Sequence, residues 1–279
     1  MEVIYSFMEQ LFPFQFMSYD FMKNAFLAMV IITPLFAILG TMIVNNKLAF
    51  FSDALGHSAF TGIAIGILLG VSDTNVSMII FAILFALVLN WIKRRNTMST
   101  DTVISVFSSL GTAVGLAILA RNGQFSQYSS LMVGDILSIT PEEIVGLLAI
   151  FVVTIIFWAL CFNRLHALSI NETLARSRGI STAFIDNCFV VITALIIMLS
   201  IRFVGILIIN ALLILPSASS RNLASNMREY HAYSIIISMF SGIFGLILSY
   251  YNNTATGPTI VIISAMVFFL TLLARPYVK

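Results

Sequence analysis

The feature of this sequence that most constrains its fold is a series of long apolar runs. Several runs reach about 18 or more residues, enough for an α-helix to cross a hydrocarbon layer about 30 Å thick, whereas a transmembrane strand is about half as long. Hydrophobic residues make up 59% of the 279 residues and charged residues only 9%. Soluble domains are roughly one quarter charged. The sequence therefore predicts an all-α, polytopic transmembrane helical bundle.

Nine apolar segments are expected to span the membrane. Their bounds are 22–44, 49–70, 76–92, 103–120, 141–162, 182–200, 203–220, 232–251 and 257–274. Only Ile201 and Arg202 separate the sixth and seventh segments, so one long broken helix, and thus eight spans, is the alternative. We expect residues 1–279 to form a single transmembrane domain. Residues 1–21 mix aromatic residues and methionine with few charges, which predicts a segment lying in the membrane interface.

The basic residues divide unevenly between the two predicted faces. With nine spans and an external N-terminus, 11 of the 14 lysines and arginines lie inside, and only Lys23, Arg121 and Arg202 lie outside. The positive-inside rule then predicts an outer N-terminus and a cytoplasmic C-terminus. The outer face would carry seven acids, which would attract cations or a basic partner. Plain solvated loop charges are the alternative interpretation.

One carboxylate and one imidazole open the second apolar segment. Asp53 and His57 are four residues apart, so a helix places them on one face, one turn from each other. Asp53 is expected to be the only acid within a span, where ionisable groups usually face the bundle interior or a water-filled path. Together the two groups suit zinc or manganese, whereas calcium prefers more oxygen ligands.

The Asp53–His57 pair supplies only half of a tetrahedral site. Two copies of the chain facing each other across a two-fold axis would supply four ligands. The alternative is a structural one, in which Ser52 or Asp53 caps the helix and His57 is an interior histidine. The spacing alone leaves both interpretations open, because a D-x-x-x-H pair is a weak motif.

Five ordered blocks of the sequence resemble the membrane permeases of bacterial ABC importers for zinc and manganese. The blocks are "FFSDALGHSAFTGIAIGILLG" from Phe50, "MVGDILSITPEEI" from Met132, "LSINETLARSRGI" from Leu168, "FVGILIINALLILPSASSRNLA" from Phe203 and "LSYYNNTATGPTIVII" from Leu248. The resemblance implies a permease fold of the type II ABC importer kind in the bacterial inner membrane. It also implies that Asp53 and His57 line an ion path at a homodimer interface. The transported ion would be zinc or manganese, zinc being favoured, with no permanent cofactor.

The same resemblance assigns a role to residues 171–179. In the family the corresponding loop is a coupling helix that rests in a groove of the ATPase subunit, which implicates Glu172, Ala175, Arg176 and Gly179. A solvated loop is the alternative. The implied partners are a second copy of the chain, cytoplasmic ABC ATPase subunits and an extracytoplasmic metal-binding protein, with no nucleic acid. Two positions depart from the family pattern: Lys47 stands without a second basic residue, and Arg202 replaces an uncharged polar residue.

Several other function classes lack their motifs in this sequence. No lysine follows a glycine, so no G-x-x-x-x-G-K-[ST] phosphate-binding loop is present, and ATP hydrolysis is expected on a separate subunit. A proton-coupled or passive metal carrier is the main alternative, although one intramembrane acid is little for a proton relay. An intramembrane metalloenzyme is less favoured because H-E-x-x-H is absent. His166 and His231 are expected to be surface groups in cytoplasmic segments.

Overall fold

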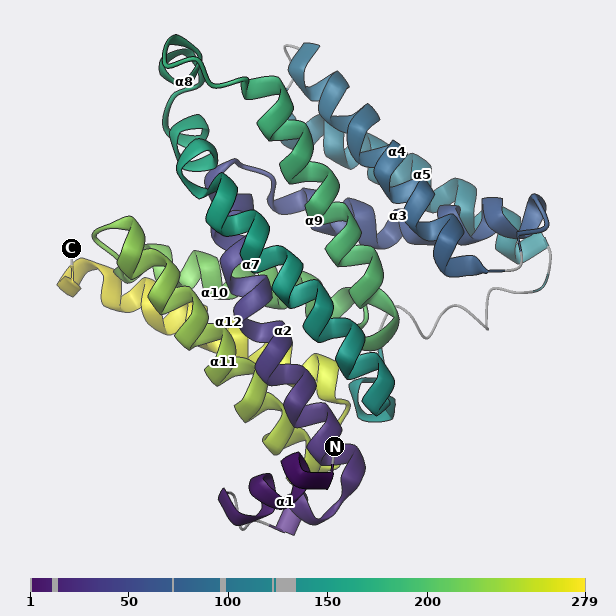
Figure 1. The fold of residues 1–279 in the computed structure, drawn as a ribbon, viewed down its shortest axis with the longest axis vertical. Coiled ribbons are helices and arrows are strands. Elements are labelled where there is room, and N and C mark those ends of the chain that lie inside the picture. Colours follow the sequence, from purple (N-terminus) through teal and green to yellow (C-terminus); the bar gives the residue numbers. More distant parts are fainter. Residues whose placement is uncertain are drawn as a thin grey trace. The chain divides into compact units, whose positions relative to one another are not determined.

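A computed structural model of residues 1–279 gives the fold (Figure 1). It describes residues 2–11, 15–71, 73–95, 99–121, 123 and 134–278. Two short 3-10 helices, Gln15–Ser18 and Ile136–Ser138, accompany the α-helices. The α-helices are α1 (Glu2–Leu11), α2 (Asp20–Asn45), α3 (Ala49–Leu68), α4 (Thr74–Arg95), α5 (Thr100–Arg121), α7 (Pro141–Ile170), α8 (Glu172–Ser177), α9 (Thr182–Val204), α10 (Ile206–Leu223), α11 (Met227–Asn252) and α12 (Thr256–Val278).

Within the described residues, nine helices are long and apolar enough to cross a membrane. They are α2 to α5, α7 and α9 to α12, and each overlaps one predicted segment, with ends that shift by up to eight residues. The predicted sixth and seventh segments form two helices, α9 and α10, and Gly205, inside the predicted seventh segment, separates them with φ 81° and ψ 157°, outside helical geometry. Glycine adopts such a positive φ without steric cost. The described residues therefore contain nine separate candidate spans, not eight.

The chain divides into two compact units. Unit 1 comprises Met1–Thr41, Val133–Ile155 and Phe203–Lys279, and unit 2 comprises Met42–Met132 and Ile156–Arg202. Three of the four boundaries fall within α2, α7 and α9, and the fourth lies between Met132 and Val133. The assignment of residues 1–279 to one functional domain stays a prediction.

In unit 1, serines of α11 hold that helix against α2. The hydroxyl of Ser238 donates to the carbonyl of Thr33 at 2.9 Å, and the hydroxyl of Ser234 donates to that of Ala37 at 3.2 Å. Small residues let transmembrane helices approach closely, and their hydroxyls can bond across the interface. Helices α10, α11 and α12 pack on one another in the same unit.

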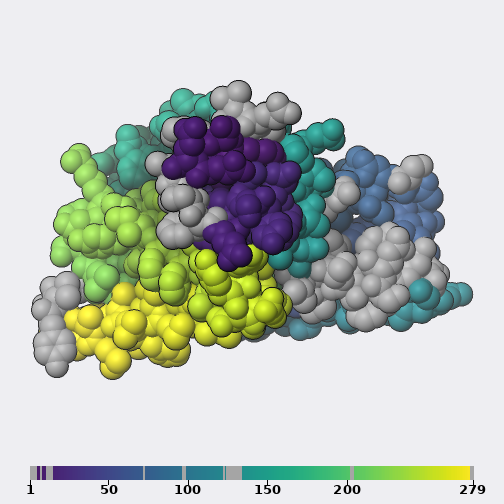
Figure 2. All heavy atoms as spheres, turned by 90° about the horizontal axis from the view of Figure 1, so that it is seen from below, coloured from purple at the N-terminus to yellow at the C-terminus, as the bar shows by residue number. Residues whose placement is uncertain are grey.

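The N-terminal segment packs on the rest of unit 1. The ring of Phe16 lies 6.3 Å from that of Tyr250, and the two regions are neighbours in Figure 2, where purple meets yellow-green. Lys23 is only 5% exposed, and its Nζ lies 2.6 Å from Oε1 of Glu9 and 2.9 Å from Oδ1 of Asp20. A buried ammonium requires such partners. These contacts tie α1 to α2, while the interfacial position of residues 1–21 stays a prediction.

In unit 2, α3 packs tightly between α4 and α5. A Cβ on Gly62 would lie 3.1 Å from Cα of Met78 in α4, and one on Gly115 would lie 2.5 Å from the backbone nitrogen of Thr61. Thr61 also donates its hydroxyl to the carbonyl of Gly111 in α5. Glycines thus allow the two neighbours to approach the backbone of α3. This close packing fixes the helix that carries Asp53 and His57.

Candidate functional site: an Asp–His pair and a charged cluster

Helix α3 begins before the Asp53–His57 pair. Its N-cap residue is Leu48, which makes no side-chain capping hydrogen bond. Ser52 lies inside the helix, where its hydroxyl donates to the carbonyl of Ala49 at 3.3 Å. Because an N-cap residue precedes the first helical turn, neither Ser52 nor Asp53 caps this helix. The capping alternative is therefore wrong.

Asp53 and His57 lie together on the exposed stripe of α3. His57 Nε2 is 3.4 Å from Asp53 Oδ1, and the side chains of Asp53 and His57 are 45% and 31% exposed. The predicted shared face is thus confirmed. Most of α3 is buried, and Phe50, which helical spacing places on the same side as the pair, is exposed. Both ligand-type side chains therefore point away from the packing of α3 against α4 and α5.

Within the described part of the chain, no group of three or more histidine, cysteine, aspartate or glutamate side chains is close enough to hold a metal ion. The Asp–His pair offers one carboxylate and one imidazole. Zinc in proteins is usually tetrahedral, with four ligands or with three and an open position. The described residues of one chain thus bring together about half of such a ligand set.

The predicted coupling segment contains a short helix, α8, with a cap at each end. Asn171 is the N-cap, and its side chain accepts a hydrogen bond from the backbone nitrogen of Leu174. At the other end Gly179 has φ 75°, its N–H donates to the carbonyl of Arg176, and the N–H of Ile180 donates to that of Ala175. These two bonds form a Schellman motif, which favours glycine at the left-handed position.

The residues of α8 divide into a packed side and an exposed side. Ala175 is 1% exposed, so it contributes packing, whereas Leu174 is 50% exposed. Sequence reasoning named Ala175 and missed Leu174. An isolated leucine among the polar residues of "NETLARSRG" is the signal that could have identified it.

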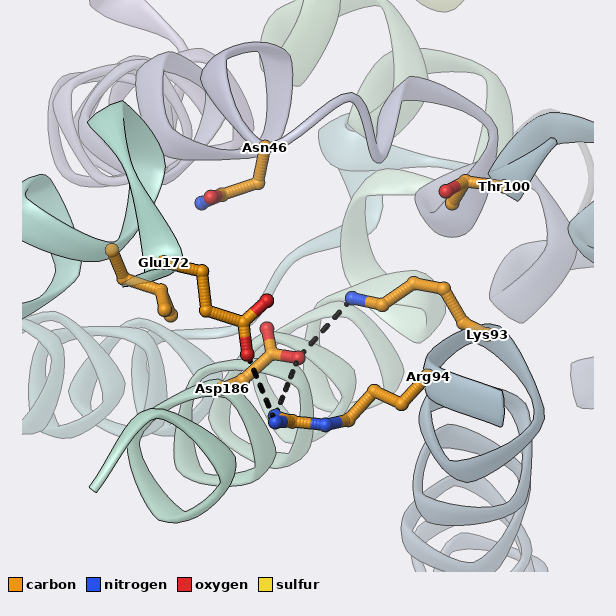
Figure 3. Close-up of a pocket in the computed structure, with 7 residues that line it drawn as sticks. Asn46, Lys93, Arg94, Thr100, Glu172 and Asp186 are labelled. Carbon is orange, nitrogen blue, oxygen red and sulfur yellow. Dashed lines mark hydrogen bonds and ion pairs between the residues drawn. The ribbon is translucent and has the colours of Figure 1, made fainter. Parts of the chain in front are cut away.

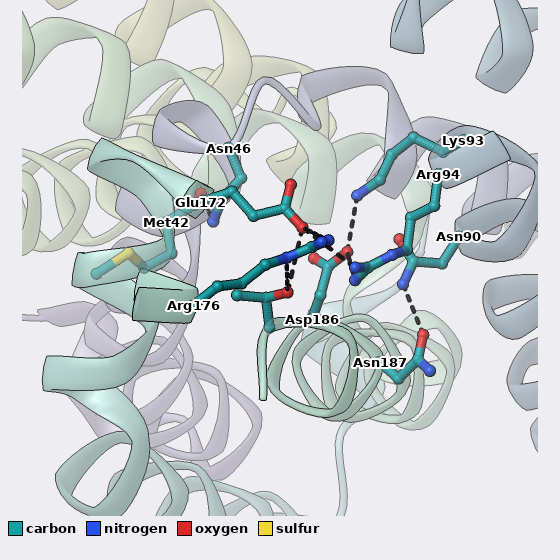
Figure 4. A network of polar contacts seen from close by, with 10 residues as sticks. Met42, Asn46, Asn90, Lys93, Arg94, Glu172, Arg176, Asp186 and Asn187 are labelled. Atoms are coloured by element: carbon teal, nitrogen blue, oxygen red, sulfur yellow. Dashed lines mark hydrogen bonds and ion pairs between the residues drawn. The ribbon is translucent and has the colours of Figure 1, made fainter. Parts of the chain in front are cut away.

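Six residues connect α8 to the ends of α4 and α9, and we call them the α8 cluster (Figure 4). Glu172 Oε1 accepts from Arg176 Nη2 at 2.6 Å and from Arg94 Nη2 at 3.2 Å. It also accepts from the hydroxyl of Thr182 at 3.1 Å. The members are Lys93, Arg94, Glu172, Arg176, Thr182 and Asp186.

Glu172 is held in its charged form by its neighbours. The hydrogen bond from Arg176 lowers the pKa of Glu172 from 4.5, and the Thr182 hydroxyl and the charges of Arg176 and Arg94 act in the same direction against a smaller effect of burial. Hydrogen bonds to a carboxylate and nearby positive charges both favour ionisation. Glu172 is therefore an anion at neutral pH, joining α8 to α4 and α9.

A polar cavity of about 310 Å³ adjoins the α8 cluster. Figure 3 shows Lys93 and Arg94 extending toward the carboxylates of Asp186 and Glu172. The cavity wall thus carries two cations and two anions, whose charges balance. The remaining lining residues are Asn46, Thr100 and Leu168.

Asp186 is a site residue that the sequence analysis missed. It lies in the second turn of α9, with a 12% exposed side chain, 3.2 Å from Lys93 Nζ and 3.6 Å from Arg94 Nη1. The expectation that Asp53 is the only acid within a span is therefore wrong. Asp186 is accommodated because two cations at the end of α4 neutralise it. The available signal was the run of three basic residues at 93–95, because the predicted topology places this run on the same cytoplasmic side of the membrane as the start of the segment that carries Asp186.

The two other histidines are partly buried. His231 lies in α11, where Nδ1 is 2.8 Å from the carbonyl of Met227 and Nε2 is 3.2 Å from the hydroxyl of Thr41. His166 lies in α7, stacked on Phe162 with ring centroids 6.0 Å apart. Both histidines lie in helices that extend beyond the predicted apolar runs, and their position in cytoplasmic segments stays a prediction. The Arg202 side chain and residues 132–133, named in the resemblance, lie outside the described residues.

Comparison with known proteins identifies the family. Residues 18–275 match the model of the ABC 3 transport family. The chain belongs to this family. The high-affinity zinc uptake system membrane protein ZnuB of Haemophilus influenzae is 32% identical over 92% of this chain and 98% of that protein. The manganese transport system membrane protein MntC of Listeria monocytogenes is 23% identical over 93% of this chain and 92% of that protein.

A solved structure confirms the fold of this ABC 3 family chain. PsaBC from Streptococcus pneumoniae in complex with Fab aligns with a TM-score of 0.78 at 23% identity, covering 97% of this chain and 95% of that chain. The resemblance to zinc and manganese permeases, the multi-pass membrane architecture and the all-helical fold class are thus confirmed. As a member of this family, the chain is a transporter component and not itself a catalyst.

Proposed function

We propose that this chain is the membrane-spanning permease subunit of an ATP-driven importer of a divalent transition metal. The observation that carries the proposal is the Asp53–His57 pair, which lies on the exposed stripe of an otherwise buried helix. The names of the relatives, which include zinc and manganese systems, support the cargo class. Residues 1–279 then act as one permease domain, with residues 1–21 in the membrane interface.

A second copy of the chain completes the ion path in this proposal. Two chains related by a two-fold axis supply two carboxylates and two imidazoles from Asp53 and His57. Four such ligands suit tetrahedral zinc, which is therefore favoured over manganese. The ion is cargo, so its ligands must bind it strongly enough to select it and weakly enough to release it.

Helix α8 is the proposed contact with a separate ATPase subunit. The exposed side chain of Leu174 is available to enter a groove, while buried Ala175 and the Schellman end at Gly179 hold the shape of α8. The contacts of Glu172 with Arg94 and Arg176 connect α8 to α4, and α4 packs on α3. A displacement of α8 by the ATPase can therefore reach the helix of the Asp–His pair within unit 2.

The proposed topology places the N-terminus outside the bacterial inner membrane and the C-terminus in the cytoplasm. The three basic residues 93–95 end α4, and Arg176 lies in α8, both on the cytoplasmic side in this arrangement. An extracytoplasmic metal-binding protein would deliver the ion to the opposite, acidic face.

Reconstitution of the chain with its ATPase tests this function directly. We expect vesicles to take up zinc only when ATP is supplied to the ATPase and the delivery protein is present. A proton-coupled or passive carrier would move the metal without ATP. Metal-stimulated ATP hydrolysis, compared for zinc and manganese, would establish the preferred cargo.

Two substitutions assign the role of the pair in the same assay. Asp53→Ala and His57→Ala should abolish metal-stimulated ATP hydrolysis, whereas Asp101→Ala, which removes an exposed acid from the first turn of α5, should leave it intact. Normal uptake by both pair variants would remove these residues from the ion path.

A further inference from the structure

A groove lined by α4 and α9 lies beside the α8 cluster. Its volume is about 640 Å³, and we call it the arginine groove. Polar side chains join the two helices at one edge, where Asn90 Nδ2 donates to Asn187 Oδ1 at 2.7 Å (Figure 4). The lining residues are Leu87, Val88, Trp91, Arg94, Arg95, Ala183 and Asn187.

One wall of the arginine groove is apolar and exposed. Leu87, Val88 and Trp91 are 37%, 47% and 55% exposed, and their spacing places them on one face of α4. This stretch belongs to a candidate membrane span. The exposed apolar surface of a span is solvated by acyl chains, and tryptophan is enriched where those chains meet the headgroups.

The end of the groove carries positive charge. Arg95 lies over the ring of Trp91, with Cζ 4.6 Å from the ring centroid. Arg94 is paired with Glu172 and Asp186, but within the described residues no carboxylate forms an ion pair with Arg95. Asn187 uses its Oδ1 to accept from Asn90, which leaves its amide nitrogen as a further donor. The groove therefore ends in one uncompensated cation and a neutral donor.

We propose that the arginine groove binds one anionic phospholipid. The acyl chain lies along Leu87, Val88 and Trp91, and the phosphate meets Arg95 with the amide of Asn187 beside it. Basic pockets between transmembrane helices bind anionic headgroups in this way. A second protein helix would have to bury Arg95 against a partner acid, whereas a lipid supplies both the apolar chain and the negative charge. The proposal requires only that α4 spans the bilayer and is independent of the cargo.

Quenching of Trp91 by brominated lipids tests this proposal. The chain has two tryptophans, so Trp158→Phe leaves Trp91 as the only one. The full-length variant is reconstituted in phosphatidylcholine vesicles with equal fractions of brominated phosphatidylglycerol or brominated phosphatidylcholine. We expect phosphatidylglycerol to quench Trp91 more strongly. Arg95→Gln, in the same background, should reduce this preference about fivefold, the effect of one cation near a lipid headgroup.

The preference is the ratio of quenching by phosphatidylglycerol to quenching by phosphatidylcholine, measured within each variant. A change in Trp91 fluorescence on losing Arg95 therefore does not distort this ratio. Arg95→Lys retains the charge and should retain the preference. Arg164→Gln removes an exposed cation of α7 and should leave the preference unchanged. Equal quenching by both lipids would overturn the proposal, because it would show that Trp91 meets bulk lipid without selection. No quenching by either lipid would also overturn it, because it would show that protein covers the groove.

Discussion

The Asp–His pair and the α8 cluster are both charged sites of unit 2, but they differ in the number of helices that form them. In the α8 cluster, Glu172 accepts hydrogen bonds from Arg94, Arg176 and Thr182. In the pair, two side chains of a single helix meet, with Asp53 Oδ1 3.4 Å from His57 Nε2. Ionisable groups within a membrane span typically serve an ion path or a ligand, whereas a network that joins several elements can serve to hold them together.

The two sites also differ in what holds them in position. The pair lies on one helix, and glycines bring α4 and α5 against the backbone of that helix. The α8 cluster joins three helices through side chains at their ends. A rigid site suits ligand selection, and a site made of side-chain contacts between elements can transmit a displacement. Substitutions in the pair should therefore affect ion selection, and substitutions in the α8 cluster should affect transmission.

The largest effect is expected from His57→Ala. Loss of a direct ligand should lower ATP-driven zinc uptake more than about 100-fold, because even outer-shell partners of metal ligands contribute about 10–100-fold. The free energy of unfolding should change by less than about 1 kcal/mol, as for other partly exposed ion pairs. Uptake and thermal unfolding, measured on the same preparation, would distinguish the two effects. His166→Ala is the matched control, and equal losses in both variants would contradict the assignment.

Gly115→Ala should disturb the support of the pair. Its new Cβ would lie 2.5 Å from the backbone nitrogen of Thr61, so α3 and α5 would have to separate. Overpacking of this kind costs about 1–3 kcal/mol. Thermal unfolding in detergent should therefore shift to lower temperature. Gly146→Ala in α7, where a Cβ meets open space, should be neutral or slightly stabilising, and equal destabilisation of both variants would exclude this reading of the packing.

Glu172→Gln should uncouple ATP hydrolysis from transport without removing the ion site. The substitution removes the charge that joins Arg94 to Arg176, and mutations along coupling networks change coupling by about 2- to 30-fold. The ratio of ATP hydrolysed to zinc transported should rise, while zinc affinity stays normal. Glu143→Gln, at the start of α7, is the control. A loss of zinc affinity in Glu172→Gln would mean that the two sites are not separate.

The contribution of Glu172 to the free energy of unfolding should be lost only in acid. Because the pKa of Glu172 is lowered in the folded protein from 4.5, its contribution is complete above that value and declines as the pH falls through the lower folded value. The difference in free energy of unfolding between the wild type and Glu172→Gln should thus be constant above about pH 5 and shrink below it. Unfolding curves from neutral to acid pH would measure it. A difference that grows on acidification would contradict the assigned charge state.

The smallest effect is expected from Gly179→Ala. A Cβ there meets nothing within 4 Å, so the only cost is the left-handed backbone at φ 75°. That conformation costs about 1–2 kcal/mol for a residue with a side chain. Faster amide hydrogen exchange in residues 172–180, with unchanged exchange in α3, is the expected signature. Unchanged exchange in residues 172–180 would show that the Schellman end does not hold α8.

The sequence predicted the spans because lipid imposes one strong requirement on them. Runs of about 20 apolar residues must be helical when no water can satisfy the backbone, so the helix positions were correct to within a few residues. The ends were less predictable. Helix α7 continues to Ile170 and α11 begins at Met227, which places His166 and His231 inside helices. Apolar content does not reveal where a helix continues beyond the hydrocarbon layer.

The site was predicted only where its residues are close in sequence. Asp53 and His57 are one turn apart on one helix, so helical periodicity alone gives their shared face. The contacts of Asp186 with Lys93 and Arg94 join residues about ninety positions apart, and no local pattern encodes such a contact. The exposed position of Leu174 likewise depends on how α8 packs. Pairings between distant segments had to come from the three-dimensional structure.

The proposal that two chains share one ion is tested most directly by the zinc stoichiometry of the purified permease. Equilibrium binding, with the chain concentration fixed by amino-acid analysis and the oligomeric state by mass measurement, gives the number of ions per chain. We predict one zinc per two chains at this site, lost in both Asp53→Ala and His57→Ala. One zinc per chain in a monomer, or binding that survives both substitutions, would contradict the shared site.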